Sequence, residues 1–280
     1  MAENRTHRSG HAMLARIVSA AILIPAVLAL IWLAPRPLFV LAVGAMGTIC
    51  MHEYLRLTAG FGARGAPWFA HAGFWVVLLA LGQARLQPAA VLALVVAAGF
   101  TAGLCRRAPM QERVWGTIAG LAGVFYLALC LLPAVLLRFD LPQQNGRVWL
   151  VIMLATIWAG DTAAFAIGGR FGRLPLAPVV SPRKTVEGAA AGLIGGTAAA
   201  IALNLLLFPR LPAGHTAAAA VVVGCFGQLG DLSESMLKRA AGVKDSSGLI
   251  PGHGGLLDRI DSVLFALPAL YGYLMWLGPR

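Results

Sequence analysis

VWLVIMLATIWAGDTAAFAIGG, residues 148–169, is an apolar run that contains one charged side chain, Asp161. Runs of about 18 or more apolar residues with few charges are typical of transmembrane helices. Similar runs precede and follow this one, and 59% of the whole chain is hydrophobic whereas only 12% is charged. The sequence therefore predicts a protein with several membrane-spanning segments, not a soluble domain with one anchor.

Nine apolar segments can be distinguished along the chain. Lipid offers no hydrogen-bond partner to an open backbone, and the segments lack the alternating pattern of barrel strands, so helices are expected. We predict an all-α polytopic membrane protein with about nine transmembrane helices. The predicted segments are 17–34, 38–55, 67–82, 86–104, 115–137, 148–169, 187–208, 215–236 and 261–278.

The basic residues predict the orientation of these segments. With nine spans, the N-terminal tail and alternate loops carry 16 of the 22 lysines and arginines, and the opposite side carries the other six. This bias predicts a cytoplasmic N-terminus and places the loops 170–186 and 237–260 in the cytoplasm. The formal charge of +11 is then explained by loops that face anionic lipid headgroups, without nucleic-acid binding.

The acidic residues divide the chain into two regions. Residues 1–147 contain four of the 11 acids, whereas residues 148–280 contain seven. We therefore predict that residues 1–147 form structural, lipid-facing helices and that residues 148–280 form the catalytic region. The adjacent pair His52 and Glu53 lacks the second histidine of a zinc motif, so we interpret this pair as interfacial.

Four aspartates of the second region are expected to converge at the cytoplasmic face. A carboxylate inside an apolar segment costs about 2.5–3.5 kcal/mol on insertion scales, so Asp161 and Asp231 need polar partners. Asp258 and Asp261 are three residues apart and share one face of the last helix. Asp231 and Asp258 together suit Mg²⁺, which binds one or two carboxylates plus substrate phosphates. Structural hydrogen bonds, or favourable charge at a helix N-terminus, are the alternatives.

The segment His253-Gly254-Gly255 precedes the last two acids and favours phosphate binding. Glycine lets a backbone approach a ligand closely, and N–H groups at a helix start can hold phosphate. An ordinary glycine turn is the alternative. Neighbouring bases strengthen the phosphate interpretation, although each alone is typical of a cytoplasmic loop; they are Lys238, Arg239, Lys244 and Arg259.

A second candidate phosphate site is SPRKTVEG, residues 181–188. Ser181 followed by Pro182 predicts a helix N-cap with proline at the first helical position. Lys184 and Thr185 would then lie in the first turn, where an anion can bind. A capped helix with interfacial bases is the alternative, but it does not explain the Lys-Thr pair beside Glu187.

The stretch SESMLKRAAGVKDSSGLIPGHGGLLDRID, residues 233–261, resembles the signature of the phosphatidate cytidylyltransferase (CDP-diacylglycerol synthase) family, including its K-D, P-G-H-G-G and D-R-x-D elements. GDTAAFAIGGRFGR, SPRKTVEG and GQLGDLSES also resemble family motifs and follow the family's order. The resemblance implies an Mg²⁺-dependent enzyme of the cytoplasmic (inner) membrane that converts CTP and phosphatidate into CDP-diacylglycerol and pyrophosphate. It also implies a homodimer.

The residues and the resemblance together predict one site, in which basic loops hold phosphates and acids hold Mg²⁺. Nucleotidyl transfer fits such a site because it needs positioning and charge neutralisation more than a protein nucleophile. The predicted catalytic residues are Asp231, Asp258, Asp261, Lys244, Asp245 and His253, with Asp231 and Asp258 as the metal ligands. The predicted substrate-binding residues are Ser181, Lys184, Thr185, Lys238, Arg239, Gly254, Gly255, Arg259 and Asp161.

Two other functions fit parts of the sequence. Another CTP-dependent lipid kinase, such as a polyprenol kinase, would transfer the γ-phosphate and release CDP. An ion-coupled transporter would use Asp161 and Asp231. Transporter sites favour the bilayer midplane between two repeats, whereas the acids here lie in one half of the chain beside large cytoplasmic loops.

Overall fold

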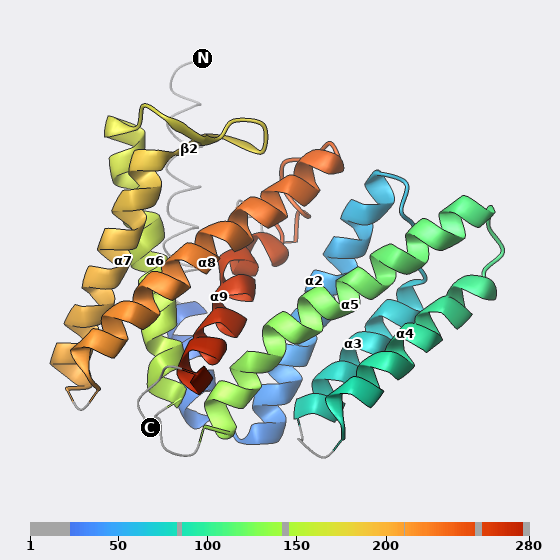
Figure 1. Cartoon of the computed structure of the whole chain (residues 1–280), viewed down its shortest axis with the longest axis horizontal. Coiled ribbons are helices and arrows are strands. Elements are labelled where there is room, and N and C mark those ends of the chain that lie inside the picture. Colours follow the sequence, from blue (N-terminus) through green and yellow to red (C-terminus); the bar gives the residue numbers. More distant parts are fainter. Residues whose placement is uncertain (1–22, 83–85, 142–145, 210, 250–253, 277–280) are drawn as a thin grey trace.

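A computed structural model describes residues 23–82, 86–141, 146–209, 211–249 and 254–276. Within these ranges the protein is mainly helical, as the sequence predicts, and successive helices run in opposite directions (Figure 1). A first helical segment, Leu23–Leu33, is followed by α2 (Arg36–Gly60), α3 (Pro67–Gly82), α4 (Pro88–Leu104), α5 (Met110–Phe139), α6 (Gly146–Phe171), β1 (Pro175–Ala177), β2 (Ser181–Thr185), α7 (Val186–Leu207), α8 (Ala213–Ala240) and α9 (Leu257–Trp276).

Five of the described helices are long and apolar enough to cross a membrane. They are α2, α5, α6, α7 and α8, whereas Leu23–Leu33, α3 and α4 are apolar but shorter. The chain is therefore a helical membrane protein. The count of nine spans and the cytoplasmic N-terminus stay predictions, and residues 1–22 lie outside the described part of the chain.

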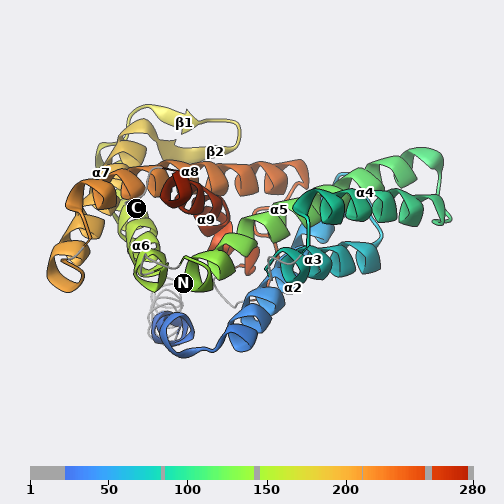
Figure 2. The same ribbon diagram turned by 60° about the horizontal axis from the view of Figure 1, so that its bottom comes forward.

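Helix α9 joins two groups of helices, α2–α5 and α6–α8. It packs against α8 on one side and α5 on the other (Figure 2). Leu264, Leu267 and Leu270 are almost fully buried in this contact region. Because α9 carries Asp258 and Asp261 in its first turns, its packing fixes these two acids at the junction of the two groups.

Small residues bring α6 and α7 close together. A Cβ atom on Gly160 would lie 3.0 Å from the carbonyl oxygen of Gly192, and one on Gly196 would lie 2.6 Å from that of Thr156. Small residues allow such close backbone approach between helices in membranes. The contact places Asp161 of α6 near the first turns of α7, where both border the same cavity.

The segment 181–185 differs from its prediction as a helix start. It forms β2, which pairs antiparallel with β1, so Ser181 is not a helix N-cap and Pro182 is not the first helical residue. Proline is compatible with the edge of a two-stranded sheet, because its missing N–H does not have to be paired there. The actual N-cap of α7 is Thr185, whose side chain accepts a hydrogen bond from the Gly188 amide at 3.1 Å. The hairpin is the exception to an all-α fold.

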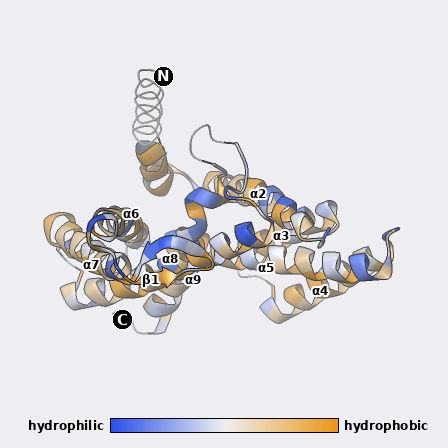
Figure 3. Cartoon of the chain, turned by 90° about the horizontal axis from the view of Figure 1, so that it is seen from above, coloured by the Kyte–Doolittle hydropathy of each residue, from blue (hydrophilic) through white to orange (hydrophobic). Residues whose placement is uncertain are grey.

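The β1–β2 hairpin and the described residues of the loop between α8 and α9 (241–249 and 254–256, called the α8–α9 loop) lie at the same end of the protein (Figure 1). In a view from above, onto this end, the helices are largely hydrophobic and hydrophilic residues gather near the hairpin and α8 (Figure 3). The loops predicted to be cytoplasmic therefore share one end of the molecule.

Candidate active site

A cavity of about 660 Å³ lies between α6, α7, α8 and the β1–β2 hairpin. Its lining brings together four of the predicted site residues, which are Asp161, Lys184, Thr185 and Asp231. Arg183 adds a second base, and Phe165 and Leu176 contribute apolar surface. A largely apolar cavity with a few convergent polar groups is typical of a small-molecule site.

Lys184 reaches the cavity because β2 leads directly into α7. Its Nζ atom lies 2.5 Å from Asp231 Oδ2, and both side chains are about a third exposed at 29% and 32%. The base of the hairpin is fixed by Glu187, whose carboxylate accepts from the Leu174 amide at 3.2 Å. Lys184 and Asp231 therefore form an ion pair that remains open to solvent and to a ligand in the cavity.

Lys238 lies between two buried acids. Its Nζ atom donates to Asp258 Oδ1 at 2.6 Å and forms an ion pair with Glu234, one turn earlier on α8. The Lys238 side chain is 11% exposed, that of Asp258 5% and that of Glu234 0%. Charges this deeply buried require partners. Lys238 is therefore part of an internal charge network, and its predicted contact with substrate stays a prediction.

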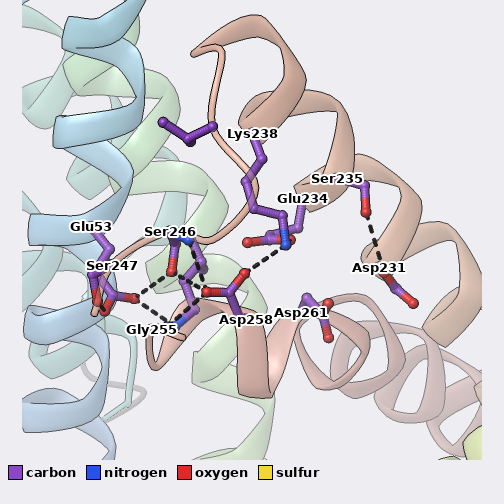
Figure 4. Close-up of polar contacts among 12 residues, drawn as sticks. Glu53, Asp231, Glu234, Ser235, Lys238, Ser246, Ser247, Gly255, Asp258 and Asp261 are labelled. Atoms are coloured by element: carbon purple, nitrogen blue, oxygen red, sulfur yellow. Dashed lines mark hydrogen bonds and ion pairs between the residues drawn. The ribbon is translucent and has the colours of Figure 1, made fainter. Parts of the chain in front are cut away.

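Asp258 is held by donors on both carboxylate oxygens (Figure 4). Besides Lys238 on Oδ1, its Oδ2 accepts from the Ser246 hydroxyl at 2.7 Å, the Ser246 amide at 2.9 Å and the Gly255 amide at 2.8 Å. Burial alone raises the pKa of this carboxyl, but the hydrogen bonds from Lys238, Gly255 and Ser246 lower it to about 2. Asp258 is therefore ionised at neutral pH.

The two glycines after His253 lie in a tightly packed turn, and their predicted contact with substrate stays a prediction. Gly254 has a φ of 78°, which favours glycine, and a Cβ on Gly255 would lie 2.0 Å from Ser246 Oγ. The amides of Gly255, Leu256 and Leu257 already donate to carboxylates of the protein. The start of α9 is thus capped by the protein's own acids, and these three amides are not free for phosphate. His253 lies outside the described residues.

Five more of the predicted site residues lie at the outside of this end. Arg239 Nε donates to the Val180 carbonyl in the hairpin at 3.2 Å, and a second nitrogen donates to the Val243 carbonyl. Ser181 begins β2 opposite Ala177. The remaining three are exposed: Lys244, Asp245 and Arg259. Arg239 therefore links the α8–α9 loop to the hairpin.

Glu53, Glu234 and Ser246 are among the polar residues at this site that were not predicted from the sequence. The interpretation of Glu53 as interfacial is wrong, because this side chain is 2% exposed and accepts hydrogen bonds from the α8–α9 loop. One available signal was its position as a lone acid within an apolar segment. Glu234 and Ser246 belong to the charged stretch already singled out, but nothing in their spacing distinguished them.

The charges of the cluster suit a divalent cation. Four carboxylates, Asp231, Glu234, Asp258 and Asp261, accompany two ammonium groups, Lys184 and Lys238, and Asp261 lies between Asp258 and Asp231 in Figure 4. Among the described residues, no group of three or more His, Cys, Asp or Glu side chains could hold a metal ion without further ligands. Mg²⁺ needs only one or two carboxylates when substrate phosphates complete its coordination, so the residues fit that ion.

The chain is similar to proteins of known activity. It matches the model of the cytidylyltransferase family over residues 14–277. It is 33% identical to a phosphatidate cytidylyltransferase of Brucella suis, over 91% of each chain, and 36% identical to one of Pseudomonas aeruginosa, over 93% of this chain and 96% of that protein. A match to the Bacillus subtilis phosphatidate cytidylyltransferase is 41% identical but covers only 48% of that relative and 46% of this chain.

Proposed function

The chain belongs to the cytidylyltransferase family, and on that premise we propose that it is a phosphatidate cytidylyltransferase, which joins CTP and phosphatidate into CDP-diacylglycerol and pyrophosphate. The observation that carries this proposal is the similarity to two phosphatidate cytidylyltransferases over more than nine tenths of the chain. The cavity supports it, because its wall combines apolar surface with Lys184, Arg183, Asp161 and Asp231 at one end of a helical membrane protein. A lipid phosphate and a nucleotide can meet in such a place.

In the proposed reaction an oxygen of the lipid phosphate attacks the α-phosphorus of CTP. A new P–O bond forms while the bond to the β-phosphate oxygen breaks, and pyrophosphate leaves with that electron pair. The attacking phosphate is already anionic, so the reaction needs charge neutralisation and alignment more than a general base. Lys184 and Arg183 are the bases best placed for phosphate, because both line the cavity. Thr185 lies beside them with its hydroxyl at the α7 cap.

We assign Mg²⁺ to Asp231 and Asp258, with Asp261 and Asp245 in supporting roles; at Asp258 the ion would have to replace the hydrogen bond from Lys238 to Oδ1. The ion would neutralise charge on the transferring phosphates. The protein's own residues prepare this place: Lys238 and Ser246 keep Asp258 ionised, and Lys184 holds the Asp231 carboxylate at the cavity wall. The site is proposed to face the cytoplasm in the inner membrane, because the two basic loops lie together at this end.

The decisive experiment uses purified protein with phosphatidate and CTP labelled at either the α- or the γ-phosphorus, with and without Mg²⁺. The proposed activity places the α-label in the lipid and releases the γ-label as pyrophosphate, and it requires Mg²⁺. In a parallel reaction with a polyprenol in place of phosphatidate, a lipid kinase would place the γ-label in the lipid and release CDP. Absence of label from the lipid in both cases would refute the proposal, and ion-coupled transport would then be the next activity to test.

A further inference from the structure

Glu53 of α2 has four hydrogen-bond contacts with the α8–α9 loop and the start of α9, although it lies in the other half of the chain; in one of them the single proton of the Ser246 hydroxyl is shared with Asp258. Oε1 accepts from the Ser247 hydroxyl at 2.5 Å and the Leu256 amide at 3.0 Å. Oε2 accepts from the Ser246 hydroxyl at 3.2 Å and the Leu257 amide at 2.7 Å. The donors lie 193 to 204 residues away in the sequence. The side chain is 2% exposed, so these bonds replace the hydrogen bonds that the carboxylate would otherwise make with water.

Only a carboxylate satisfies all four donors. Each oxygen of Glu53 accepts one hydroxyl and one backbone N–H, and the two amides belong to the unpaired N–H groups at the start of α9. A glutamine has one carbonyl oxygen and one NH₂ group, so in either orientation its NH₂ would face a backbone N–H. The negative charge is also favourable beside the positive end of the α9 dipole.

Ser246 connects Glu53 to Asp258. Its hydroxyl lies 3.2 Å from Glu53 Oε2 and 2.7 Å from Asp258 Oδ2, and Figure 4 shows the two carboxylates on either side of it. A Cβ on Gly255 would lie 2.0 Å from Ser246 Oγ and 2.5 Å from Glu53 Oε1. The four residues therefore form one packed unit, in which a displacement of Glu53 would reach Asp258. Ser247 binds Glu53 but has no bond to Asp258 among the described contacts.

We infer that Glu53 is a positioning residue for cytidylyl transfer: it anchors the α8–α9 loop to α2 and, through Ser246, sets the place of Asp258. The inference rests on the proposed function. Glu53 touches no reacting group in this role. It explains why a lone acid is buried in an otherwise apolar part of α2, and it gives the first half of the chain a part in catalysis.

The first test compares Glu53→Gln with Glu112→Gln, a control that alters a partly exposed ion pair with Arg106 in the same half of the chain. Full-length purified protein is treated with trypsin, because Lys244 in the loop and Arg183 in the hairpin are both exposed. We expect Glu53→Gln to raise the rate of cleavage at Lys244 at least about 10-fold, since cleavage follows local opening. Cleavage at Arg183 should not change, and Glu112→Gln should behave as wild type. Unchanged cleavage at Lys244 would overturn the anchor.

The second test uses the matched serines and remains informative if Glu53→Gln does not fold. Ser246→Ala should lower kcat and raise the KM for CTP, each about 10-fold, because it removes the link to Asp258. Ser247→Ala should change either constant by less than about threefold. A smaller fraction of folded enzyme would lower the apparent kcat without raising KM, so the KM for CTP separates positioning from simple instability.

Equal effects of the two serine substitutions would overturn the route through Ser246. The trypsin comparison does not depend on catalysis. Wild-type protein that makes no CDP-diacylglycerol would therefore refute the proposed function while still allowing the anchor to be tested.

Discussion

The α8–α9 loop and the β1–β2 hairpin lie at the same end of the protein, but they use their charged residues differently (Figure 1). Beside the loop, the carboxylates of Glu53 on α2 and Asp258 on α9 are buried and make eight hydrogen-bond contacts, two of which share the single proton of the Ser246 hydroxyl. In the hairpin, Lys184 keeps one ion pair, with Asp231, and its side chain is 29% exposed. One region is fixed by internal bonds, and the other presents its charge to a cavity.

The two regions are suited to different roles: the loop to holding Asp258 in position, and the hairpin to contacting the substrate. Buried, fully bonded carboxylates cannot be displaced cheaply, so the loop is suited to fix the position of Asp258. A partly exposed ion pair contributes little to stability and can exchange partners, so Lys184 is free to turn from Asp231 to a phosphate. Substitutions in the loop should therefore impair both local structure and activity, whereas those on the hairpin side should impair activity alone.

The largest effect is expected for Asp258→Asn. Donors face both oxygens of Asp258, so either orientation of the amide places its NH₂ against a donor. We expect activity to be nearly abolished and trypsin cleavage at Lys244 to become faster, in protein that is still inserted in the membrane. Asp140→Asn is the control, because Asp140 pairs with Arg36 at the opposite end. Wild-type turnover by Asp258→Asn would contradict the assignment.

Asp231→Asn should nearly abolish activity as well, but without loosening the loop. Asp231 lines the cavity and pairs with Lys184, and it makes no described contact with the α8–α9 loop. The expected result is loss of CDP-diacylglycerol formation at ordinary Mg²⁺ with wild-type cleavage at Lys244. If the loop loosened equally in both variants, the distinction between the two regions would be wrong.

The sequence predicted the helices and the half of the chain that carries most of the acidic residues. Both predictions rest on local properties, namely the length of the apolar segments and the distribution of the acids. Asp161 and Asp231 were found because carboxylates in apolar segments are costly. Glu53 carried the same signal, an acid in an apolar segment, but its partners could not be predicted because they lie about 200 residues away in the sequence. The hairpin was missed because Ser181-Pro182 is also typical of a helix start, and Thr185, the real cap, follows only four residues later.

Lys184 should show an intermediate effect, confined to activity. A cation that contacts phosphate in a partly desolvated site contributes about 1.5–3 kcal/mol. Lys184→Ala should therefore lower kcat/KM about 10- to 150-fold, and Lys184→Arg should restore only part of it because the planar guanidinium does not reproduce a compact ammonium. Arg173→Ala, a change at an exposed base before the hairpin, should leave activity near wild type.

The same series tests the alternative in which Lys184 only sets topology. In that case any base would serve, and alanine would cost little because the other bases on the predicted cytoplasmic side remain. Each variant is checked for membrane insertion. Equal kcat/KM for wild type, Lys184→Ala and Lys184→Arg would mean that the hairpin only sets the topology and that other basic residues bind the phosphates.

The smallest effect on activity is expected for single cysteines that report topology. In a variant without Cys50, Cys105, Cys130 and Cys225, Val179→Cys in the hairpin and Leu249→Cys in the loop lie at positions that are 87% and 56% exposed. Gly214→Cys, at the start of α8 and at the opposite end, also has room, because no atom lies within 4 Å of its Cβ position.

If the basic loops are cytoplasmic, an impermeant thiol reagent should label only Gly214→Cys in intact cells and all three cysteines after permeabilisation. Both regions of the comparison must give the same answer, because Arg239 joins them through Val180 and Val243. Labelling of Val179→Cys and Leu249→Cys in intact cells, with protection of Gly214→Cys, would invert the topology. Such an inversion would place the cavity on the side of the membrane opposite to cytoplasmic CTP. An inverted topology would therefore also contradict the proposed reaction.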